Sequence, residues 1–176
     1  MQSKNSQDGT IGNPQERSHF KIGYILGIVD GEGCYQLESD GKGHCYPSLT
    51  ISNTDNKIIQ QTISYLKDLG IECWSWSPKN YGKETRPYQR IYVKGLRRLK
   101  KYLDIFTNYP HAKLERALLL KEFCELRLKI PNKQLYLNGV HDYSKENELK
   151  SKLSQLNSKF KGAKSSETIR FGANST

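Results

Sequence analysis

Two carboxylates stand close together in residues 25–33, ILGIVDGEG, where an apolar stretch ends in glycines. Asp30 and Glu32 would lie at the C-terminal end of a helix that begins near His19, with Ser18 as its N-cap. The helix macrodipole is negative at that end, so acids there are either exposed to water or compensated by a cation. Carboxylate oxygens are also ligands that Mg²⁺ and Mn²⁺ prefer. The segment therefore indicates either a divalent-metal site or an ordinary glycine-rich helix end.

Two glycines upstream of these acids also carry information. Gly23 and Gly27 lie four residues apart on the same predicted helix, so they form a stripe without side chains. Such a stripe would allow a second helix to pack closely against the first.

The positive charge of the chain is concentrated in one window. The 176 residues have a net charge of +10, and residues 79–101 contain nine basic residues and one acidic residue. Tyr81, Tyr88 and Tyr92 are interspersed among them. A surplus of this size favours a polyanionic partner, and a basic, aromatic two-stranded ribbon suits the major groove of DNA. For the basic residues of 96–106, a solvated helix face is an equal alternative.

Composition and spacing argue against several other classes of protein. No apolar run approaches the roughly 20 residues of a membrane-spanning helix, so we expect no membrane partner. The four cysteines include no C-x-x-C pair and the four histidines lack metal-ligand spacing. This pattern disfavours a zinc site and favours free thiols in an intracellular, reducing compartment. Residues 1–17 are polar, unlike a secretory signal, and we expect a disordered leader there.

The predicted elements alternate between helices and hairpins. The first helix is followed by strands over 34–39 and 44–52, then by a helix capped by residues 53–55 and ended by Gly70. A second hairpin has strands over 71–77 and 88–94, and helices over 96–106, 113–129 and 144–158 follow. This order predicts an α+β domain over 18–170, with one four-stranded antiparallel sheet, helices on one face and a flexible tail over 171–176. Trp74 and Trp76 are expected in the core or at an edge.

Residues 25–33 resemble the LAGLIDADG motif of homing endonucleases. The Asp-x-acid-Gly ending agrees, although Leu26 stands where a small residue is usual and Glu32 where Asp is more frequent. Residues 153–170 resemble the C-terminal helix and DNA-backbone-contacting tail of homodimeric members. The order of elements resembles their αββαββα fold, in which the sheet forms a DNA-binding saddle. The resemblance implies an intron-encoded, site-specific endonuclease that cuts double-stranded DNA with Mg²⁺ or Mn²⁺.

The resemblance also implies catalytic roles. Glu32 would bind the metal ion, with the carbonyl of Gly31 as a second contact. Lys113 would stabilise charge near the scissile phosphate, and its alternative is an ordinary surface lysine in a first helical turn. Asp55 would position water.

A single copy of the motif implies a homodimer in this family. Two chains packed through Gly23 and Gly27 would bring two Glu32 side chains together on a two-fold axis. Asp30 would order the helix end and the interface rather than bind metal.

Base reading would fall to the polar face of the sheet. The candidates are Gln36, Glu38, Tyr46, Ser48, Thr50, Ser52, Ser75, Arg90 and Tyr92. Their chemistry suits major-groove base edges, because Arg matches guanine, Gln matches adenine and Glu matches cytosine. A shift of one residue in a strand would exchange its two faces. Phosphate contacts are assigned to Lys159, Lys161 and Lys164.

Two alternatives use the same residues differently. A protein of the same fold could bind intron RNA as a maturase, or regulate DNA without cleaving it, but the presence of both Glu32 and Lys113 favours the enzyme. An unrelated basic RNA-binding domain would need neither metal nor a dimer. The family resemblance leans toward a gene in an organelle (chloroplast or mitochondrion), and a bacterial cytoplasmic protein is also compatible.

Overall fold

The computed structural model describes residues 13–40, 44–77, 88–130 and 143–163, with the side chains of 159–163 excepted. Along the chain the elements are α1 (Pro14–Glu32), β1 (Gly33–Ser39), β2 (Cys45–Asn53), α2 (Asn56–Asp68), β3 (Trp74–Trp76), β4 (Gln89–Lys94), α3 (Leu96–Phe106), α4 (Leu114–Lys129) and α6 (Ser144–Ala163). In this part of the chain, no helix is long and apolar enough to cross a membrane.

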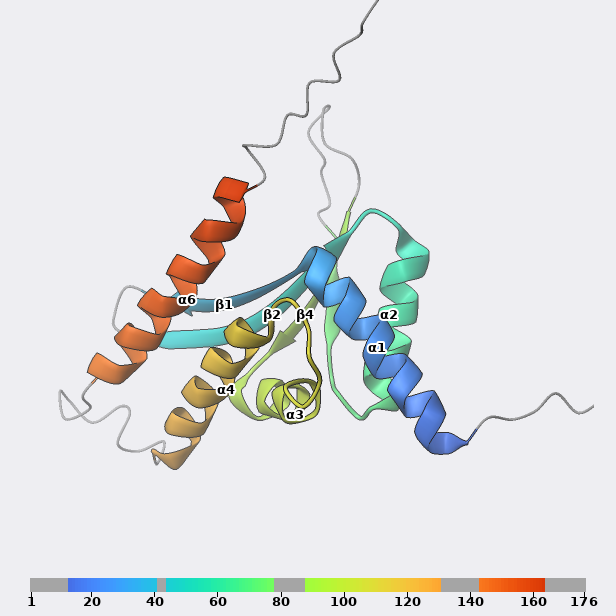
Figure 1. The fold of residues 1–176 in the computed structure, drawn as a ribbon, viewed down its shortest axis with the longest axis horizontal. Helices are drawn as coiled ribbons and strands as arrows, with labels where there is room; N and C mark the ends of the chain where they lie inside the picture. Colours follow the sequence, from blue (N-terminus) through green and yellow to red (C-terminus); the bar gives the residue numbers. More distant parts are fainter. Residues whose placement is uncertain (1–12, 41–43, 78–87, 131–142, 164–176) are drawn as a thin grey trace, which may run out of the picture.

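The four strands form one antiparallel sheet in the order β1-β2-β4-β3. Figure 1 shows α1 and α2 at one end of the sheet and α4 and α6 toward the other, with α3 beneath the central strands. The predicted α+β fold, with its αββαββα order and additional C-terminal helices, is therefore confirmed.

The start of α1 differs from the prediction. The helix begins at Pro14 rather than near residue 19, and Asn13 is its N-cap, with Oδ1 accepting a hydrogen bond from the Gln15 amide at 3.1 Å. The expected cap, Ser18, lies inside the helix and donates from its hydroxyl to the Pro14 carbonyl. An Asn followed by Pro at the first helical position is the stronger start signal, because Pro lacks only an amide that has no partner there. Residues 14–17 of the predicted leader are thus helical.

Among the other boundaries, β3 spans only Trp74–Trp76 rather than the predicted 71–77, whereas α2 and α3 agree with the sequence pattern. Helix α3 spans Leu96–Phe106 as predicted, after Gly95 with a φ of +91°. Asp55 caps α2 by accepting the Lys57 amide at 2.7 Å. Helix α6 continues to Ala163, five residues beyond the prediction. The four cysteines are free thiols, as their spacing indicated.

Alternation along the strands separates a core face from an open face. The core face carries buried residues on every long strand: Tyr35, Leu37, Leu49, Ile51, Ile91 and Val93. The opposite face, here called the open face, carries Cys34, Gln36, Glu38, Tyr46, Ser48, Thr50, Ser52, Arg90, Tyr92 and Lys94. The candidate base-reading residues of β1, β2 and β4 therefore share one face, as predicted.

Strand β3 has the opposite phase to the one predicted. Ser75 pairs with Ile91, a core-face residue, whereas Trp74 pairs with Tyr92 and Trp76 pairs with Arg90 on the open face. The two indole side chains are 43% and 46% exposed. Ser75 was assigned to the polar face because it is polar, but apolar side chains also occupy surfaces, so residue type alone does not give the face. The tryptophans lie at an edge of the sheet, as one of the two expected placements had it, because β3 is an edge strand, and neither lies in the core. The assignment of Ser75 to the DNA-reading face was wrong.

Helix α6 is attached to α4 by a buried ion pair. Arg127 donates from one guanidinium nitrogen to both carboxylate oxygens of Glu146, at 2.7 and 2.8 Å. The side chains are only 8% and 3% exposed. Removing one partner of such a pair leaves a buried, unpaired charge, whereas removing both does not.

We predict that Arg127→Met lowers the free energy of unfolding by about 3–5 kcal/mol. The double variant Arg127→Met/Glu146→Leu should recover most of this loss, because neither position of the pair then carries a buried charge. Denaturant titration followed by circular dichroism measures both. Lys145→Met, which breaks only exposed ion pairs with Glu122 and Glu148, is the control and should cost about 0–1 kcal/mol. Equal losses in the single and double variants would contradict the account.

Candidate functional site

The C-terminal end of α1 is tied to the start of α4 by Asp30. Its two carboxylate oxygens accept the backbone amides of Ala112 at 2.9 Å and Lys113 at 3.1 Å. These amides immediately precede Leu114, the first residue of α4. A carboxylate at a helix N-terminus satisfies amides that have no partner within the helix and complements the positive end of the macrodipole. Asp30 therefore orders the helix ends, as its position in the sequence indicated.

Lys113 completes the same junction from the other side. Its Nζ donates to the carbonyl of Val29 at 2.8 Å and to that of Gly33 at 2.6 Å, and the residue is 7% exposed. A cation at this position offsets the negative end of α1. Burial lowers the pKa of the Lys113 amine, while the nearby Asp30 carboxylate opposes that shift. Lys113 is thus a buried part of the junction and not a surface lysine.

The junction leaves Glu32 exposed between the two carbonyls that Lys113 binds. Within the described residues, Glu32 has neither a hydrogen bond nor an ion pair. Its side chain lines a groove of about 270 Å³, together with Cys34, Gln36, Glu38, Thr50, Ser52, Arg90, Tyr92 and Lys94. Except for Glu32, all of these residues belong to the open face. The acidic helix end and the polar sheet surface therefore form one continuous site.

The donors available at this helix end are suited to a hard cation. Glu32 and Gly31 are exposed and offer carboxylate and carbonyl oxygens, which Mg²⁺ and Mn²⁺ favour. No group of three or more His, Cys, Asp and Glu side chains that could hold a metal ion occurs among the described residues. Among the described residues, Glu32 is therefore the uncommitted carboxylate at this helix end.

Arg90 is held in place at the centre of the open face. Its Nε donates to the Ser52 hydroxyl at 3.0 Å, and its terminal nitrogens donate to the hydroxyls of Tyr88 and Tyr92 at 3.3 and 3.4 Å. The guanidinium carbon also lies 6.0 Å from the centre of the Trp76 ring. A guanidinium fixed in this way loses little side-chain entropy when it binds a planar acceptor such as a guanine edge.

A second polar group bridges the sheet. Lys94 on β4 forms an ion pair with Glu38 on β1 at 3.6 Å, across the intervening strand β2. Ser48 pairs with Lys94 on this same face, is only 1% exposed, and its hydroxyl lacks a hydrogen-bond partner among the described residues. Exposed ion pairs are worth only about 0–1 kcal/mol, so a binding partner could open this one at small cost. Opening it would expose an unpaired hydroxyl.

Asp55 lies at the start of α2, directly after β2. It is exposed, and its Oδ1 is committed to capping the helix through the Lys57 amide. Asn53 in turn accepts the amide of Asp55 at 2.7 Å. The capping role predicted for this turn is confirmed, and a role in positioning water stays a prediction.

The glycines of α1 line an exposed strip of the helix. A Cβ added at Gly23, Gly27 or Gly31 would meet no atom within 4 Å, and all three residues are exposed. Phe20, on the same strip, is 64% exposed. The buried side of α1 consists of Ile22, Ile25, Leu26 and Val29. This strip is the surface on which a second helix was expected to pack.

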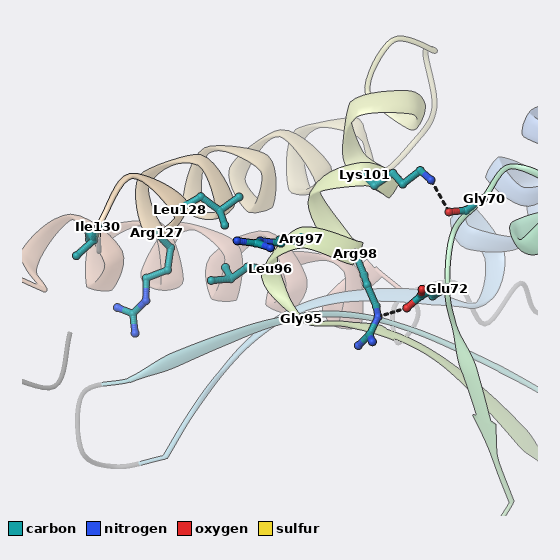
Figure 2. Close-up of a pocket in the computed structure, with 10 residues that line it drawn as sticks. All are labelled: Gly70, Glu72, Gly95, Leu96, Arg97, Arg98, Lys101, Arg127, Leu128 and Ile130. Atoms are coloured by element: carbon teal, nitrogen blue, oxygen red, sulfur yellow. Dashed lines mark hydrogen bonds and ion pairs between the residues drawn. The ribbon is translucent and has the colours of Figure 1, made fainter. Parts of the chain in front are cut away.

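The basic window of the sequence is divided between two surfaces. Arg90 and Lys94 lie on the open face, whereas Arg97, Arg98 and Lys101 of α3 border a separate cavity of about 910 Å³ between the start of α3 and the end of α4. Figure 2 shows Lys101 reaching the Gly70 carbonyl and Arg98 paired with Glu72 beside this cavity. Lys100 forms an ion pair with Asp104, so three of the four α3 cations are engaged within the chain. Residues 79–87 lie outside the described residues.

The predicted phosphate contacts receive little structural description. Positions 159 and 161 fall within α6, but their side chains lie outside the described residues, as does Lys164. Their contact with phosphate stays a prediction.

Comparisons with known proteins agree with this geometry. The family model described as a LAGLIDADG-like domain matches residues 19–106, half of the chain, from α1 to the end of α3. The comparison with curated proteins found no match.

Solved structures resemble this one in fold. The archaeal intron-encoded homing endonuclease I-Vdi141I, complexed with DNA, is 18% identical with a TM-score of 0.56, and the match covers 78% of this chain and 84% of that one. The homing endonuclease I-CvuI, in complex with its target in the presence of Ca, is 21% identical with a TM-score of 0.57, covering 80% and 84%. The homing endonuclease I-LtrWI bound to target DNA is 17% identical with a TM-score of 0.56, and this chain spans 47% of its length. The family match, the sheet topology and the acidic end of α1 agree: the chain belongs to the LAGLIDADG family.

Proposed function

We propose that this chain is one subunit of a homodimeric DNA endonuclease of the homing type, which cuts a long, nearly palindromic site with Mg²⁺ or Mn²⁺. One observation carries the proposal: the exposed carboxylate at the end of α1 lines the same groove as the polar residues of the open face. A surface that can read base edges is thereby continuous with a group that can hold a divalent cation. The solved relatives bound to DNA support this use of the fold.

Glu32 would hold the cation through its carboxylate, with the Gly31 carbonyl as a second oxygen donor. When bound, a cation of this kind activates water for attack on phosphorus and stabilises the leaving oxygen. The residues around Glu32 fix its position. Lys113 binds the carbonyls of Val29 and Gly33 on either side of it, and Asp30 anchors the same helix end to α4. Lys113 is therefore a positioning residue in this proposal, and its role in stabilising charge near the scissile phosphate stays a prediction.

The open face would read the major groove. Its polar residues project from three neighbouring strands, and Arg90 is fixed toward a guanine edge by Ser52, Tyr88 and Tyr92. The Glu38–Lys94 ion pair would open on contact with DNA, which would give the buried Ser48 hydroxyl a partner. Asp55, with its second carboxylate oxygen, would position water beside the scissile phosphate.

Dimerisation would complete the site. One chain contributes one exposed acid at the helix end, whereas cutting both strands requires two such sites. Packing two copies of α1 through the strip of Gly23 and Gly27 would bring the two Glu32 side chains together on the two-fold axis. Residues 153–170 would contact phosphates at the margins of the DNA.

We predict that Glu32→Gln reduces cleavage at least about 100-fold while leaving DNA affinity nearly unchanged, because the variant loses the cation ligand but keeps the open face. A randomised palindromic duplex library, incubated with the wild type and Mg²⁺ or EDTA, identifies a cleaved site. Cleavage and binding of that site by the variant are then measured. Glu72→Gln is the control, since Glu72 pairs with Arg98 outside the groove, and it should cleave normally. Binding of DNA or intron RNA without metal-dependent cutting would instead favour a maturase or regulator.

A second prediction concerns the dimer. Gly27→Leu should convert the dimer to a monomer and abolish double-strand cutting, because the added side chain fills the exposed strip. It should not unfold the chain, since a Cβ at Gly27 meets no atom within 4 Å. Sedimentation analysis measures the mass, and circular dichroism measures the fold. Gln15→Leu, an exposed substitution in the first turn of the same helix, should remain dimeric. A Gly27→Leu protein that dimerises as tightly as the wild type would contradict this interface.

The third prediction tests the role of Lys113. Lys113→Met should lower the free energy of unfolding by about 1–3 kcal/mol, because two carbonyls lose their donor. The pKa of Lys113 is below 10.5 in the folded chain, so the unfolded chain binds more protons between that lowered value and about pH 10.5. The contribution of Lys113 to stability is therefore complete above about pH 10.5 and is lost as the pH falls through the folded pKa.

Unfolding titrations of wild type and Lys113→Met from about pH 8 to about pH 10.5 measure this difference. It should grow as the pH rises. Lys152→Met, at an exposed ion pair with Glu148, is the control and should cost about 0–1 kcal/mol. A difference that shrinks toward alkaline pH would contradict this account, because it would show that the folded chain favours the protonated form of the Lys113 amine.

A further inference from the structure

Two tryptophans stand on an otherwise polar surface. Trp74 and Trp76 are the two ends of β3, they are 43% and 46% exposed, and both face the same way as Arg90 and Tyr92. Trp74 stacks on Tyr92 with ring centres 6.0 Å apart and an interplanar angle of 27°. Trp76 lies beside the Arg90 guanidinium, whose carbon is 6.0 Å from the ring centre.

These contacts hold both rings in place without covering them. Each indole packs on a neighbour in the sheet and still exposes nearly half of its surface. The next strands carry hydrogen-bonding groups on this face, including Ser52, Thr50 and Gln36. An apolar, preorganised area beside polar groups fits a partner whose surface is mainly polar but carries small apolar groups.

Double-stranded DNA has one apolar group at a base edge in the major groove, the C5-methyl group of thymine. Residues two apart on a strand are separated by about 6.7 Å, which corresponds to about two base-pair steps of 3.4 Å. The two rings are therefore spaced to meet two separate base pairs. Trp76 also neighbours Arg90, whose guanidinium matches a guanine edge.

We propose that Trp74 and Trp76 are specificity-determining residues that bind thymine methyl groups in each half of the target. The thymine that meets Trp76 neighbours the guanine that meets Arg90. This inference rests on the proposed function, because it assumes that the open face binds duplex DNA. Other residues of the open face would recognise hydrogen-bond donors and acceptors of the bases, whereas these two would bind apolar methyl groups.

The alternative occupant is an unpaired base stacked on the indole faces, as in proteins that bind single strands. The two occupants differ in one chemical respect. Stacking tolerates every base and is nearly indifferent to a methyl group, whereas edge contact depends on the methyl group. Replacing thymine by uracil removes only that methyl group and keeps the Watson–Crick pairing.

The experiment begins with selection of preferred sites from a randomised palindromic duplex library by the wild-type protein. Each preferred thymine is then replaced by uracil, and the dissociation constant is measured for both duplexes in EDTA, which prevents cleavage. Removing one contacted methyl group should weaken binding about fourfold. Trp74→Ala and Trp76→Ala should each bring the uracil-to-thymine ratio of dissociation constants close to 1 at the base pairs they contact. Leu118→Ala, at an exposed apolar residue of α4, is the control and should keep the wild-type ratios.

The uracil substitution needs no change in the protein, so a variant that fails to fold leaves the test intact. A wild-type protein that binds uracil and thymine duplexes equally overturns the inference and leaves the proposed function standing. Ratios that persist in both tryptophan variants also overturn it, since the methyl groups are then bound elsewhere. Binding to single strands but to no duplex overturns both the inference and the proposed function.

Discussion

The architecture depends on how the chain neutralises the C-terminal end of α1. That end has carbonyls without intrahelical partners, a negative macrodipole and two acidic side chains within three residues. Two sets of hydrogen bonds compensate this end. The Lys113 amine donates to the carbonyls of Val29 and Gly33, and the Asp30 carboxylate accepts the amides just before α4. Each helix thus supplies what the other lacks at its end. The second acid, Glu32, is left exposed.

This junction also determines where the sheet begins. Lys113 binds the carbonyl of Gly33, the first residue of β1, so α1, β1 and α4 meet at one point. Gly33 is required there, because a Cβ would lie 2.6 Å from the Val29 carbonyl oxygen and 2.8 Å from its Cα. The first residue of β1 therefore lies against the last turn of α1, with no room for a side chain. As a result Glu32 lies beside Cys34, the first residue of the open face, and the acid and the polar strands share one groove.

The sequence predicted those elements whose residue type and local pattern agree. The bounds of helix α3 agree with the prediction, because Gly95 precedes it and Leu99, Tyr102, Leu103 and Phe106 form one buried face. The open face of β1, β2 and β4 followed from strict alternation. Strand β3 failed because it has three residues, too few for a period to be visible, and residue type then decided wrongly between Ser75 and its neighbours.

At the site, too, local position predicted some roles, whereas contacts between distant residues could not be predicted. That Asp30 orders the helix end followed from its position, but its partners just before α4 are more than eighty residues away, and spacing cannot reveal them. Lys113 was recognised only by family resemblance, since a lysine in a first helical turn is ordinarily exposed. Its burial depends on tertiary packing against α1 and β1, which neither composition nor the spacing of apolar residues predicts.

In the proposed DNA complex, the distribution of charge would separate affinity from specificity. The chain carries a net charge of +10, yet the groove of the open face is lined by two acids, Glu32 and Glu38, and two bases, Arg90 and Lys94. The groove is therefore formally neutral, and the surplus cations lie elsewhere in the chain. Phosphate contacts supply most of the salt-dependent affinity for DNA, whereas base edges are read by fixed hydrogen-bonding and apolar groups. A neutral groove fits the second task, because a strongly cationic floor would attract any sequence equally and would neutralise the carboxylate that a divalent cation needs.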